Sequence, residues 1–162
     1  MVPAVTLFEP TTAVERATVF TDGACKGNPG PGGWAWAESP SRYESGFEAA
    51  TTNQRMELTA VLRAVVANPG RLCVVSDSIY VVNCFRQRWW RGWRQKGWRN
   101  AKGQPVANQD LWRPLIEQVV EARAGEIELT WVKGHSGHPM NDFVDRLAVE
   151  AAQWQRASSA RV

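Results

Sequence analysis

Two aspartates, Asp22 and Asp77, each follow directly after a short apolar segment. A β-strand that ends in an acid holds the carboxylate on rigid backbone, at the edge of a sheet where ligands bind. Glu57 and Asp145 lie in segments with the apolar spacing of helices, on sides that can face such a sheet. Four converging carboxylates need divalent metal to stay ionised, and oxygen ligands favour Mg²⁺ or Mn²⁺. The acids therefore predict a metal site suited to in-line attack at a phosphodiester.

Each of these acids also has a simpler structural interpretation. A strand-end Asp or a helical Glu is often a solvated surface charge, and Asp110 and Asp142 are typical acids of a first helical turn. His135 lies in a glycine-flanked segment, and its usual pKa suits proton transfer near neutral pH. Its alternative is a loop histidine with a local hydrogen bond. His138, which precedes a proline, is expected to buttress the same loop.

Segment 86–102 combines positive charge with aromatic residues. It holds seven Lys and Arg residues and no acid, which leaves 12 basic residues against all 16 acidic ones in the rest of the chain. Four of the nine tryptophans lie here, at Trp89, Trp90, Trp93 and Trp98. A cationic surface on an otherwise acidic domain suggests a polyanionic partner. The alternative for the tryptophans is packing between two short helices, which the i,i+4 spacing of Trp89 and Trp93 favours in part.

Hydrophobic periodicity predicts the elements that must position these residues. Apolar or alternating segments predict strands at 16–20, 34–37, 42–49, 72–76 and 126–133. Three- and four-residue spacing predicts helices from Thr52 or Asn53 to about 67, at 79–85, from Asn108 or Gln109 to about 122, and from Asn141 to about 154. Short connections make the first three strands an antiparallel meander, followed by parallel strands. We therefore predict an α/β domain with a five-stranded mixed sheet flanked by helices, in which Asp22 and Asp77 lie side by side.

The length and composition are those of one ordinary globular domain. The 162 residues are 44% hydrophobic and 22% charged, and no apolar run approaches the roughly 20 residues of a membrane span. We expect a flexible tail at 1–15, the domain at 16–155 and a frayed tail at 156–162. The first residues do not resemble a signal peptide, and three cysteines without CxxC spacing are expected to be reduced thiols. The expected location is the cytoplasm, with no membrane partner.

Several short motifs follow one another in a specific order along the chain. They are Phe20-Thr21-Asp22-Gly23, the glycine turn 27–33, Thr52 to Glu57, Ser76-Asp77-Ser78, Val132 to His135 and Asn141 to Ala148. Together they resemble ribonuclease H type 1, over about residues 16–152. The resemblance implies a ribonuclease H-like fold and sequence-independent cleavage of the RNA strand of RNA–DNA hybrids. It further implies two Mg²⁺ ions, for which Mn²⁺ can substitute, products with 3′-hydroxyl and 5′-phosphate ends, action on R-loops and RNA primers, and a monomeric enzyme.

The resemblance also assigns roles to individual residues. Asp22 matches the carboxylate that bridges both metals, and Asp145 matches a ligand of the ion that activates water. Glu57 and Asp77 match ligands of the second ion, at the leaving oxygen. His135 matches the loop histidine that assists proton transfer or product release. The implied substrate contacts are Cys25, Asn28, Thr52, Asn53, Gln54, Trp89, Trp93, Arg94, Lys96, Trp98 and Asn108.

All of these implied contacts except Cys25 fall into three groups. Asn28, Asn53 and Gln54 match residues that reach the minor groove and the RNA sugars. Thr52 and Asn108 match a pocket for a DNA phosphate. Segment 86–102 matches the basic protrusion of the family, and we call it the handle. Its basic residues suit phosphate, and its indoles suit stacking on a deoxyribose.

Two positions depart from the family pattern, and two other functions stay open. Ile79 stands where a polar residue near the minor groove is common, and Met140 replaces an acid that is common before Asn141. The alternatives are a catalytically inactive hybrid-binding module on the same fold, and another nuclease of the superfamily, such as a transposase or junction resolvase. An inactive copy would be free to lose a carboxylate, and none is missing. The handle and the glycine turn are not shared by the other nucleases of the superfamily.

Overall fold

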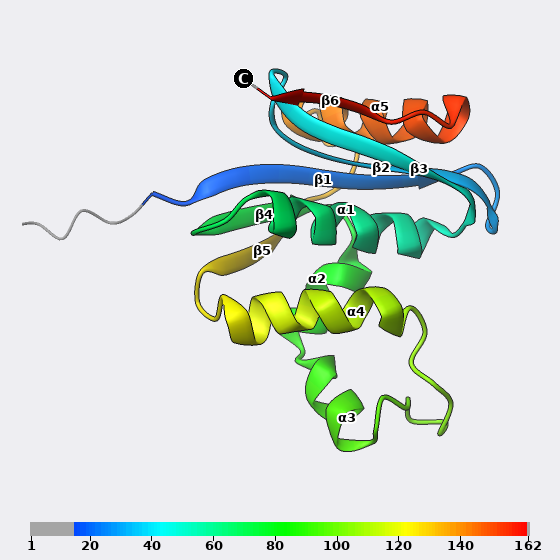
Figure 1. The fold of residues 1–162 in the computed structure, drawn as a ribbon, viewed down its shortest axis with the longest axis vertical. Helices are drawn as coiled ribbons and strands as arrows, with labels where there is room; N and C mark the ends of the chain where they lie inside the picture. The colour runs from blue at the N-terminus through cyan, green and yellow to red at the C-terminus, as the bar shows by residue number, and fades with distance from the viewer. Residues whose placement is uncertain (1–14, 162) are drawn as a thin grey trace, which may run out of the picture.

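A six-stranded mixed sheet lies between helices that cover both of its faces (Figure 1). The computed structural model describes residues 15–161. The strands are β1 (Ala17–Cys25), β2 (Gly30–Ser39), β3 (Arg42–Thr51), β4 (Leu72–Ser76), β5 (Ile127–Trp131) and β6 (Ser158–Arg161). The helices are α1 (Asn53–Ala67), α2 (Ile79–Arg86), α3 (Trp89–Gln95), α4 (Gln109–Ile116), the π-helical segment η1 (Glu117–Ala122) and α5 (Pro139–Trp154). The order of strands across the sheet is β5-β4-β1-β2-β3-β6.

The strands around β1 are arranged as the sequence predicts. β1, β2 and β3 form the antiparallel meander, with Asp22 opposite Ala35. β4 pairs parallel with β1, so that Thr21 lies opposite Ser76, and β5 pairs parallel with β4. Because these three parallel strands end at the same edge of the sheet, the residues that follow them are brought together there.

The C-terminal segment is a strand, which corrects two predictions. β6 pairs antiparallel with β3, with Tyr43 opposite Ala160, so the sheet has six strands rather than five. The expected frayed tail at 156–162 is therefore wrong for the residues of β6. This segment reads Ser-Ser-Ala-Arg and shows no apolar alternation, because it is held by pairing with the β3 edge rather than by a buried face. Of the expected N-terminal tail, all but Glu15 lies outside the described residues.

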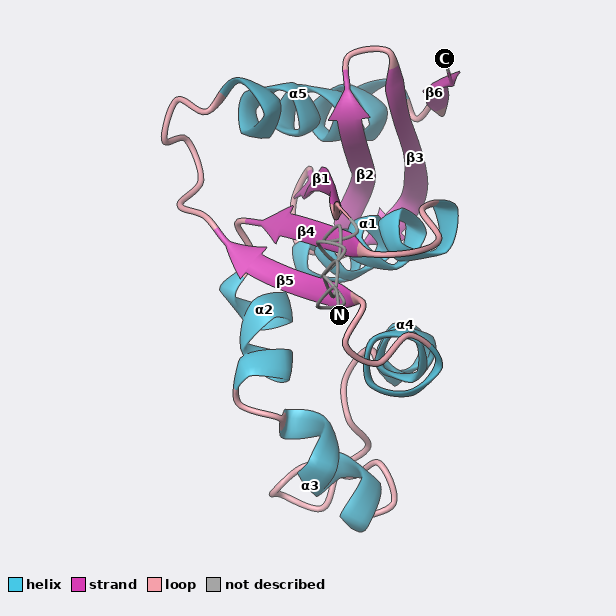
Figure 2. Cartoon of the chain, turned by 90° about the vertical axis from the view of Figure 1, so that its left-hand side faces the viewer, coloured by secondary structure: helices cyan, strands magenta, loops and turns pink. Residues whose placement is uncertain are grey.

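Two long helices cover opposite faces of the sheet, with α5 on one side and α1 on the other (Figure 2). The Thr52 side chain caps α1 by accepting a hydrogen bond from the Arg55 backbone N–H, as predicted. The prediction that Asn141 caps α5 is wrong by three residues. The His138 side chain is the cap: its Nδ1 accepts from the Met140 N–H at 3.2 Å. The His138 ring also stacks on Phe20 of β1, which confirms the expected buttress.

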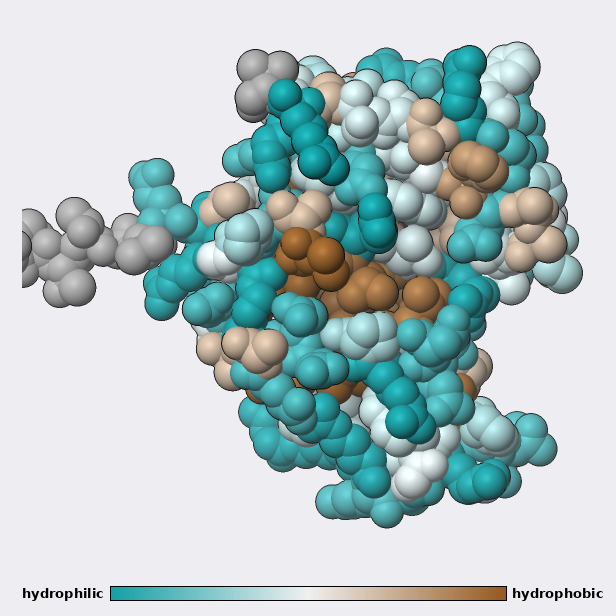
Figure 3. Space-filling model, viewed as in Figure 1, coloured by the Kyte–Doolittle hydropathy of each residue, from teal (hydrophilic) through white to brown (hydrophobic). Residues whose placement is uncertain are grey.

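The handle and its neighbouring helices form the end of the molecule opposite α5 (Figure 1). The predicted helix over 109–122 is present as α4 followed directly by η1. Indole rings in tilted contact link the handle to α4. Their ring centroids are 6.2 Å apart for Trp89 and Trp93, 6.1 Å for Trp93 and Trp98, and 5.6 Å for Trp93 and Trp112. The visible surface at this end is mostly hydrophilic (Figure 3). None of the described helices has both the length and the apolar character needed to cross a bilayer.

Candidate active site

Asp22, Glu57 and Asp77 converge at the carboxyl ends of the parallel strands. Each offers one oxygen, and these three oxygens all lie within 4.8 Å of one another. Asp22 is 4% exposed and Glu57 is 7% exposed, whereas Asp77 is half-buried. We refer to these residues as the three-carboxylate cluster. The predicted convergence is present, but the predicted end of the first strand at residue 20 is wrong: β1 continues to Cys25, and Asp22 lies within it, next to the last β1–β4 pair at Thr21.

Close contact between β1 and α1 places Glu57 against Asp22. A Cβ on Gly23 would lie 2.4 Å from the Glu57 backbone nitrogen, so only glycine allows the helix to sit this close to the strand. The Gly23 N–H also donates to Asp22 Oδ1 at 2.8 Å, which orients that carboxylate. Gly23, the residue after Asp22 in β1, therefore sets the positions of two of the three carboxylates.

Burial and mutual repulsion make the cluster costly without a cation. Burial, followed by repulsion from Asp77, raises the pKa of Asp22 from 3.8 to about 8. The pKa of Glu57 is raised well above its usual value, again by burial first and then by Asp22. The pKa of Asp77 is raised by burial and by Asp145, while His135 opposes this rise. Within residues 15–161, no Lys or Arg forms an ion pair with any of the three acids.

A divalent cation fits this donor set. Glu57 Oε2 is buried and has no hydrogen-bond partner within the described part of the chain, so one acceptor of the cluster is unused. An oxygen-only set with three negative charges suits a hard ion such as Mg²⁺ or Mn²⁺. The ion would also compensate the repulsion that raises the three pKa values. The protein thus offers the ligands of a metal centre together with the charge that a metal would neutralise.

Asp145 and His135 lie beside the three-carboxylate cluster. Asp145 is half-buried on α5, and its charge raises the pKa of both Asp22 and Asp77, so it is near both of them. It does not belong to the set of oxygens within 4.8 Å. His135 is exposed on the β5–α5 loop at φ 55°, and it acts electrostatically on Asp77. The predicted convergence is therefore seen for three carboxylates, with the fourth acid and the histidine alongside.

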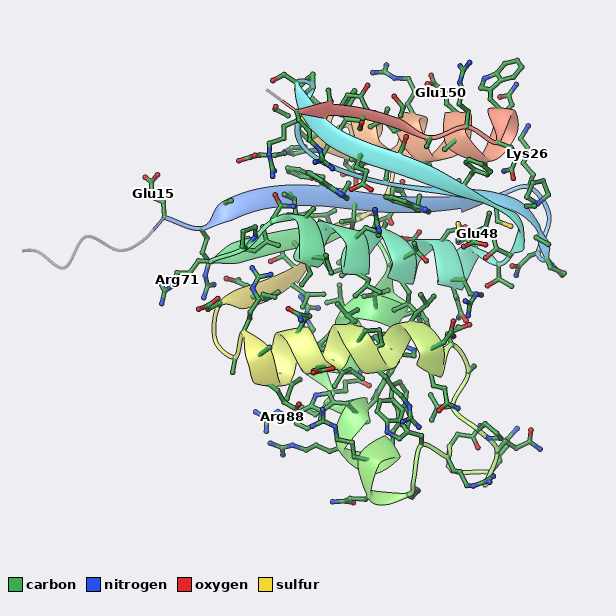
Figure 4. The ribbon with its side chains drawn as sticks, in the orientation of Figure 1. Glu15, Lys26, Glu48, Arg71, Arg88 and Glu150 are labelled. Carbon is green, nitrogen blue, oxygen red and sulfur yellow. The ribbon has the colours of Figure 1, made fainter. Side chains whose placement is uncertain are left out.

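The glycine turn and the start of α1 form a second part of the site. Asn28 Oδ1 accepts from the Asn53 backbone N–H at 3.1 Å, and both residues are exposed. Gln54, the next residue, is exposed as well. The Cys25 thiol contacts the carbonyl oxygens of Gly30 and Thr51 at 3.4 Å each. The structure thus brings the predicted minor-groove residues together at the glycine turn and the start of α1, where the Asn28 side chain is anchored by the Asn53 backbone N–H. Lys26 and Glu48 are labelled at the same end of the sheet in Figure 4.

Asn108 is held between α1 and α4 by residues that the sequence reasoning missed. Arg55 Nη1 donates to Asn108 Oδ1 at 3.3 Å, and Asn108 Nδ2 donates to the Tyr80 hydroxyl at 3.2 Å. Arg55 also forms two hydrogen bonds to Asp110, at 2.9 and 2.7 Å, and these hold the pKa of Asp110 below its usual value. Asp110 is thus a partner of Arg55 as well as a first-turn acid. The cap residue Thr52 lies three residues before Arg55.

In the handle, both interpretations of the tryptophans find support. Trp89, Trp93 and Trp98 are half-buried against one another, as the packing interpretation requires, and they keep part of their surface exposed. Arg94 forms an ion pair with Glu121 at 2.8 Å, so part of its charge is compensated. Lys96 is exposed. Arg88 is labelled at this end in Figure 4.

Comparison with known proteins assigns the chain to a family. The family model described as RNase H matches residues 14–153. The chain belongs to the RNase H family. A Ribonuclease H of Novosphingobium aromaticivorans is 46% identical over 144 residues, which cover 86% of this chain and 98% of that protein. A Ribonuclease H of Thermus thermophilus is 46% identical over 146 residues, which cover 87% and 86% of the two chains.

A solved structure extends this comparison to the fold. It is titled as a type 1 RNase H with the type 2 active-site motif, and it is 32% identical with a TM-score of 0.72. The alignment covers 92% of this RNase H and 78% of the solved chain. The predicted family, the ribonuclease H-like fold and the enzyme class, a nuclease, are confirmed. The match also favours ribonuclease H over the other superfamily nucleases.

Proposed function

We propose that this RNase H hydrolyses the RNA strand of RNA–DNA hybrids with two divalent metal ions held by Asp22, Glu57, Asp77 and Asp145. The observation that carries the proposal is the three-carboxylate cluster, in which Asp22 and Glu57 are buried, Asp77 is half-buried, and no acid forms an ion pair with a Lys or Arg of residues 15–161. When bound, Mg²⁺ or Mn²⁺ supplies Lewis-acid stabilisation of the reacting phosphate and favours deprotonation of the attacking water. The products would carry 3′-hydroxyl and 5′-phosphate ends.

The side chains of the protein have separate tasks in this proposal. Asp22 would be a ligand of both ions, Asp145 of one ion, and Glu57 and Asp77 of the other. Because Glu57 Oε2 has no hydrogen-bond partner among the described residues, it needs no rearrangement to act as a ligand. His135 holds or releases a proton at its imidazole, on an exposed loop next to Asp77.

The surfaces around the cluster suit a hybrid duplex with two different strands. The polar groups of Cys25, Asn28, Asn53 and Gln54 would contact the RNA strand and the minor groove, with Asn28 and Cys25 held by hydrogen bonds to the backbone. Thr52 and Asn108 would bind a DNA phosphate. In the handle, Arg94 and Lys96 would contact further phosphates, and Trp89, Trp93 and Trp98 would offer indole surface to the DNA sugars. Contacts to backbone and sugars make the cleavage independent of sequence.

The broader role follows from this substrate. Hybrids arise in R-loops and at RNA primers, and we propose their removal, by a monomer in the cytoplasm, as the function of the protein.

Ile79 is 55% exposed, so an apolar side chain rather than a polar one faces solvent beside Asp77.

A cleavage assay with matched variants tests the proposal. Purified protein with Mg²⁺ is expected to cut the RNA of a labelled hybrid and to spare duplex RNA, duplex DNA and single strands. Asp77→Asn is expected to retain hybrid binding and to lose cleavage. Asp142→Asn, at an exposed acid in the first turn of α5, is the matched control and should cut normally.

The same experiment separates the enzyme from an inactive binding module. A wild-type protein that binds the hybrid in Mg²⁺ without cutting it would contradict the proposal and favour the module. An Asp77→Asn protein that cuts at the wild-type rate would show that Asp77 is not a required metal ligand.

A further inference from the structure

A tryptophan outside the predicted site contacts the backbone of Asp77. Trp131 is the last residue of β5 and lies opposite Ser76, the last residue of β4. Its indole Nε1–H donates to the carbonyl oxygen of Asp77 at 3.0 Å. One residue further on, the Val132 N–H donates to the Ser76 carbonyl at 3.0 Å. The β5 side therefore binds two consecutive carbonyl groups, those of Ser76 and Asp77.

The chain after Asp77 is held as well. The Ser78 N–H donates to Ser76 Oγ at 3.1 Å, and the Ser78 side chain caps α2 by accepting from the Val81 N–H. The peptide groups on both sides of Asp77 are thus fixed by hydrogen bonds. Of these contacts, the indole hydrogen bond is the one that occupies the Asp77 carbonyl itself. A carbonyl at a strand end requires such a partner or water.

The segment that follows β5 also contacts the carboxylate of Asp77. A Cβ on Gly134 would lie 2.7 Å from Asp77 Oδ2, closer than carbon and oxygen atoms approach without a shift. The backbone of the loop that carries His135 therefore packs directly against this side chain. Residues 131–134 contact Asp77 at its carbonyl and at its carboxylate.

We propose that the segment 131–134 positions Asp77, with the Trp131 indole N–H as the contact that fixes its backbone. The inference rests on the proposed function, because it treats Asp77 as a metal ligand. Asp77 is repelled by Asp145 and is only half-buried, so an unanchored side chain would turn toward solvent. The indole and the Gly134 backbone limit this movement. They also tie Asp77 to the loop that carries His135. Trp131 acts through Asp77 and is a positioning residue.

Trp131→Phe tests the hydrogen bond, because it removes the N–H and keeps most of the aromatic surface. Trp36→Phe is the matched control: Trp36 is 2% exposed, and its indole donates to Glu44 at 3.1 Å. Mg²⁺ titrations followed by ¹H–¹⁵N NMR measure metal binding without substrate. We expect Trp131→Phe to weaken Mg²⁺ binding by about threefold to tenfold, the equivalent of one hydrogen bond. Trp36→Phe should bind Mg²⁺ like the wild type even if its melting temperature falls.

A spectroscopic signature distinguishes positioning from general stability. The Trp131 indole cross-peak, identified by its loss in Trp131→Phe, should move during the wild-type Mg²⁺ titration with the same midpoint as the Gly23 amide. The Trp36 indole peak should stay in place. The Mg²⁺ concentration for half-maximal cleavage should rise by the same threefold to tenfold in Trp131→Phe, with an unchanged KM for the hybrid. A stationary Trp131 peak, or Mg²⁺ binding by Trp131→Phe equal to that of Trp36→Phe, would overturn the inference.

Gly134→Ala keeps the inference testable if Trp131→Phe does not fold. The added Cβ displaces the Asp77 carboxylate, which is the end of a movable side chain, so the fold is retained while Mg²⁺ binding weakens. Mg²⁺ binding like that of the wild type would contradict the loop contact. A wild type that binds Mg²⁺ and spares the hybrid would refute the proposed function alone. A Trp131→Phe protein that binds Mg²⁺ normally and cuts the hybrid would refute the positioning role alone.

Discussion

Asp22→Asn is expected to stabilise the metal-free protein and to abolish cleavage. Asp22 is 4% exposed, and burial and the neighbouring Asp77 raise its pKa to about 8. In the absence of metal at pH 7, the folded protein must therefore either hold a proton on Asp22 that the unfolded chain would release, or keep an unfavourable charge next to Glu57. Asparagine has nearly the same shape and carries no charge. The substitution removes the repulsion and a metal ligand at the same time.

The size and the sign of the expected stability change follow from the difference in the pKa of Asp22 between the folded and unfolded states. The folded state binds the Asp22 proton more tightly, so the free energy of unfolding decreases as the pH rises from 3.8 to about 8. One pKa unit corresponds to about 1.4 kcal/mol, so the cost at pH 7 reaches about 4 kcal/mol. The amide must also be desolvated, and Glu57 and Asp77 still repel each other. We therefore expect a gain of about 1–3 kcal/mol, or about 3–9 °C in melting temperature.

Thermal unfolding followed by circular dichroism measures this effect in EDTA at pH 5, 7 and 9. The variant should melt above the wild type at pH 7 and 9, with a smaller difference at pH 5. Mg²⁺ should raise the melting temperature of the wild type and have little effect on Asp22→Asn, because a ligand stabilises only the state that binds it. Asp142→Asn is the control for loss of an exposed acid. A variant less stable than the wild type at pH 9, or a difference that grows as the pH falls, would refute the reasoning.

Three further predictions concern the substrate surface and the sheet edge. Simultaneous replacement of the handle residues Arg91, Arg94 and Lys96 by Ala should weaken hybrid binding and make it less dependent on salt. Fluorescence anisotropy at several salt concentrations measures how steeply the affinity falls with salt. An unchanged salt dependence would mean that another surface binds the phosphates of the hybrid. Arg55→Ala should raise the KM for the hybrid with little change in kcat, because it removes the hydrogen bond that holds Asn108. In steady-state kinetics, a changed kcat with a normal KM would contradict this. Deletion of 158–162 should lower the free energy of unfolding by about 1–2 kcal/mol in urea titrations and leave cleavage intact; unchanged stability would mean that β6 contributes nothing.

The sequence predicts those parts of the fold in which a buried face requires apolar residues at regular spacing. α1 shows helical spacing, and β4 is a continuous apolar strand, so the order and direction of the strands around Asp22 and Asp77 could be inferred. β6 has no such face, and its pairing depends on the open edge of β3. A short polar strand of this kind cannot be distinguished from a tail by composition.

The candidate site also has parts that the sequence predicts and parts that it does not. The carboxylates could be predicted because acids at strand ends have a local signature. The roles of Arg55 and Trp131 could not, because their partners lie far away in sequence: the Trp131 hydrogen bond spans 54 residues and the Arg55–Asp110 pair spans 55. No periodicity encodes such a contact. The one available signal was the position of Trp131 near the end of the strand predicted over 126–133.

Two glycines connect the local and the long-range parts of the site. At Gly23 the absence of a Cβ lets α1 approach β1 and sets Glu57 against Asp22. At Gly134 it lets the loop backbone approach the Asp77 carboxylate. The three-carboxylate cluster is destabilised by its own charge, so its geometry cannot come from attraction between its members. It must come from backbone contacts that leave the carboxylates little room to move apart, which these two glycines and the Trp131 indole supply.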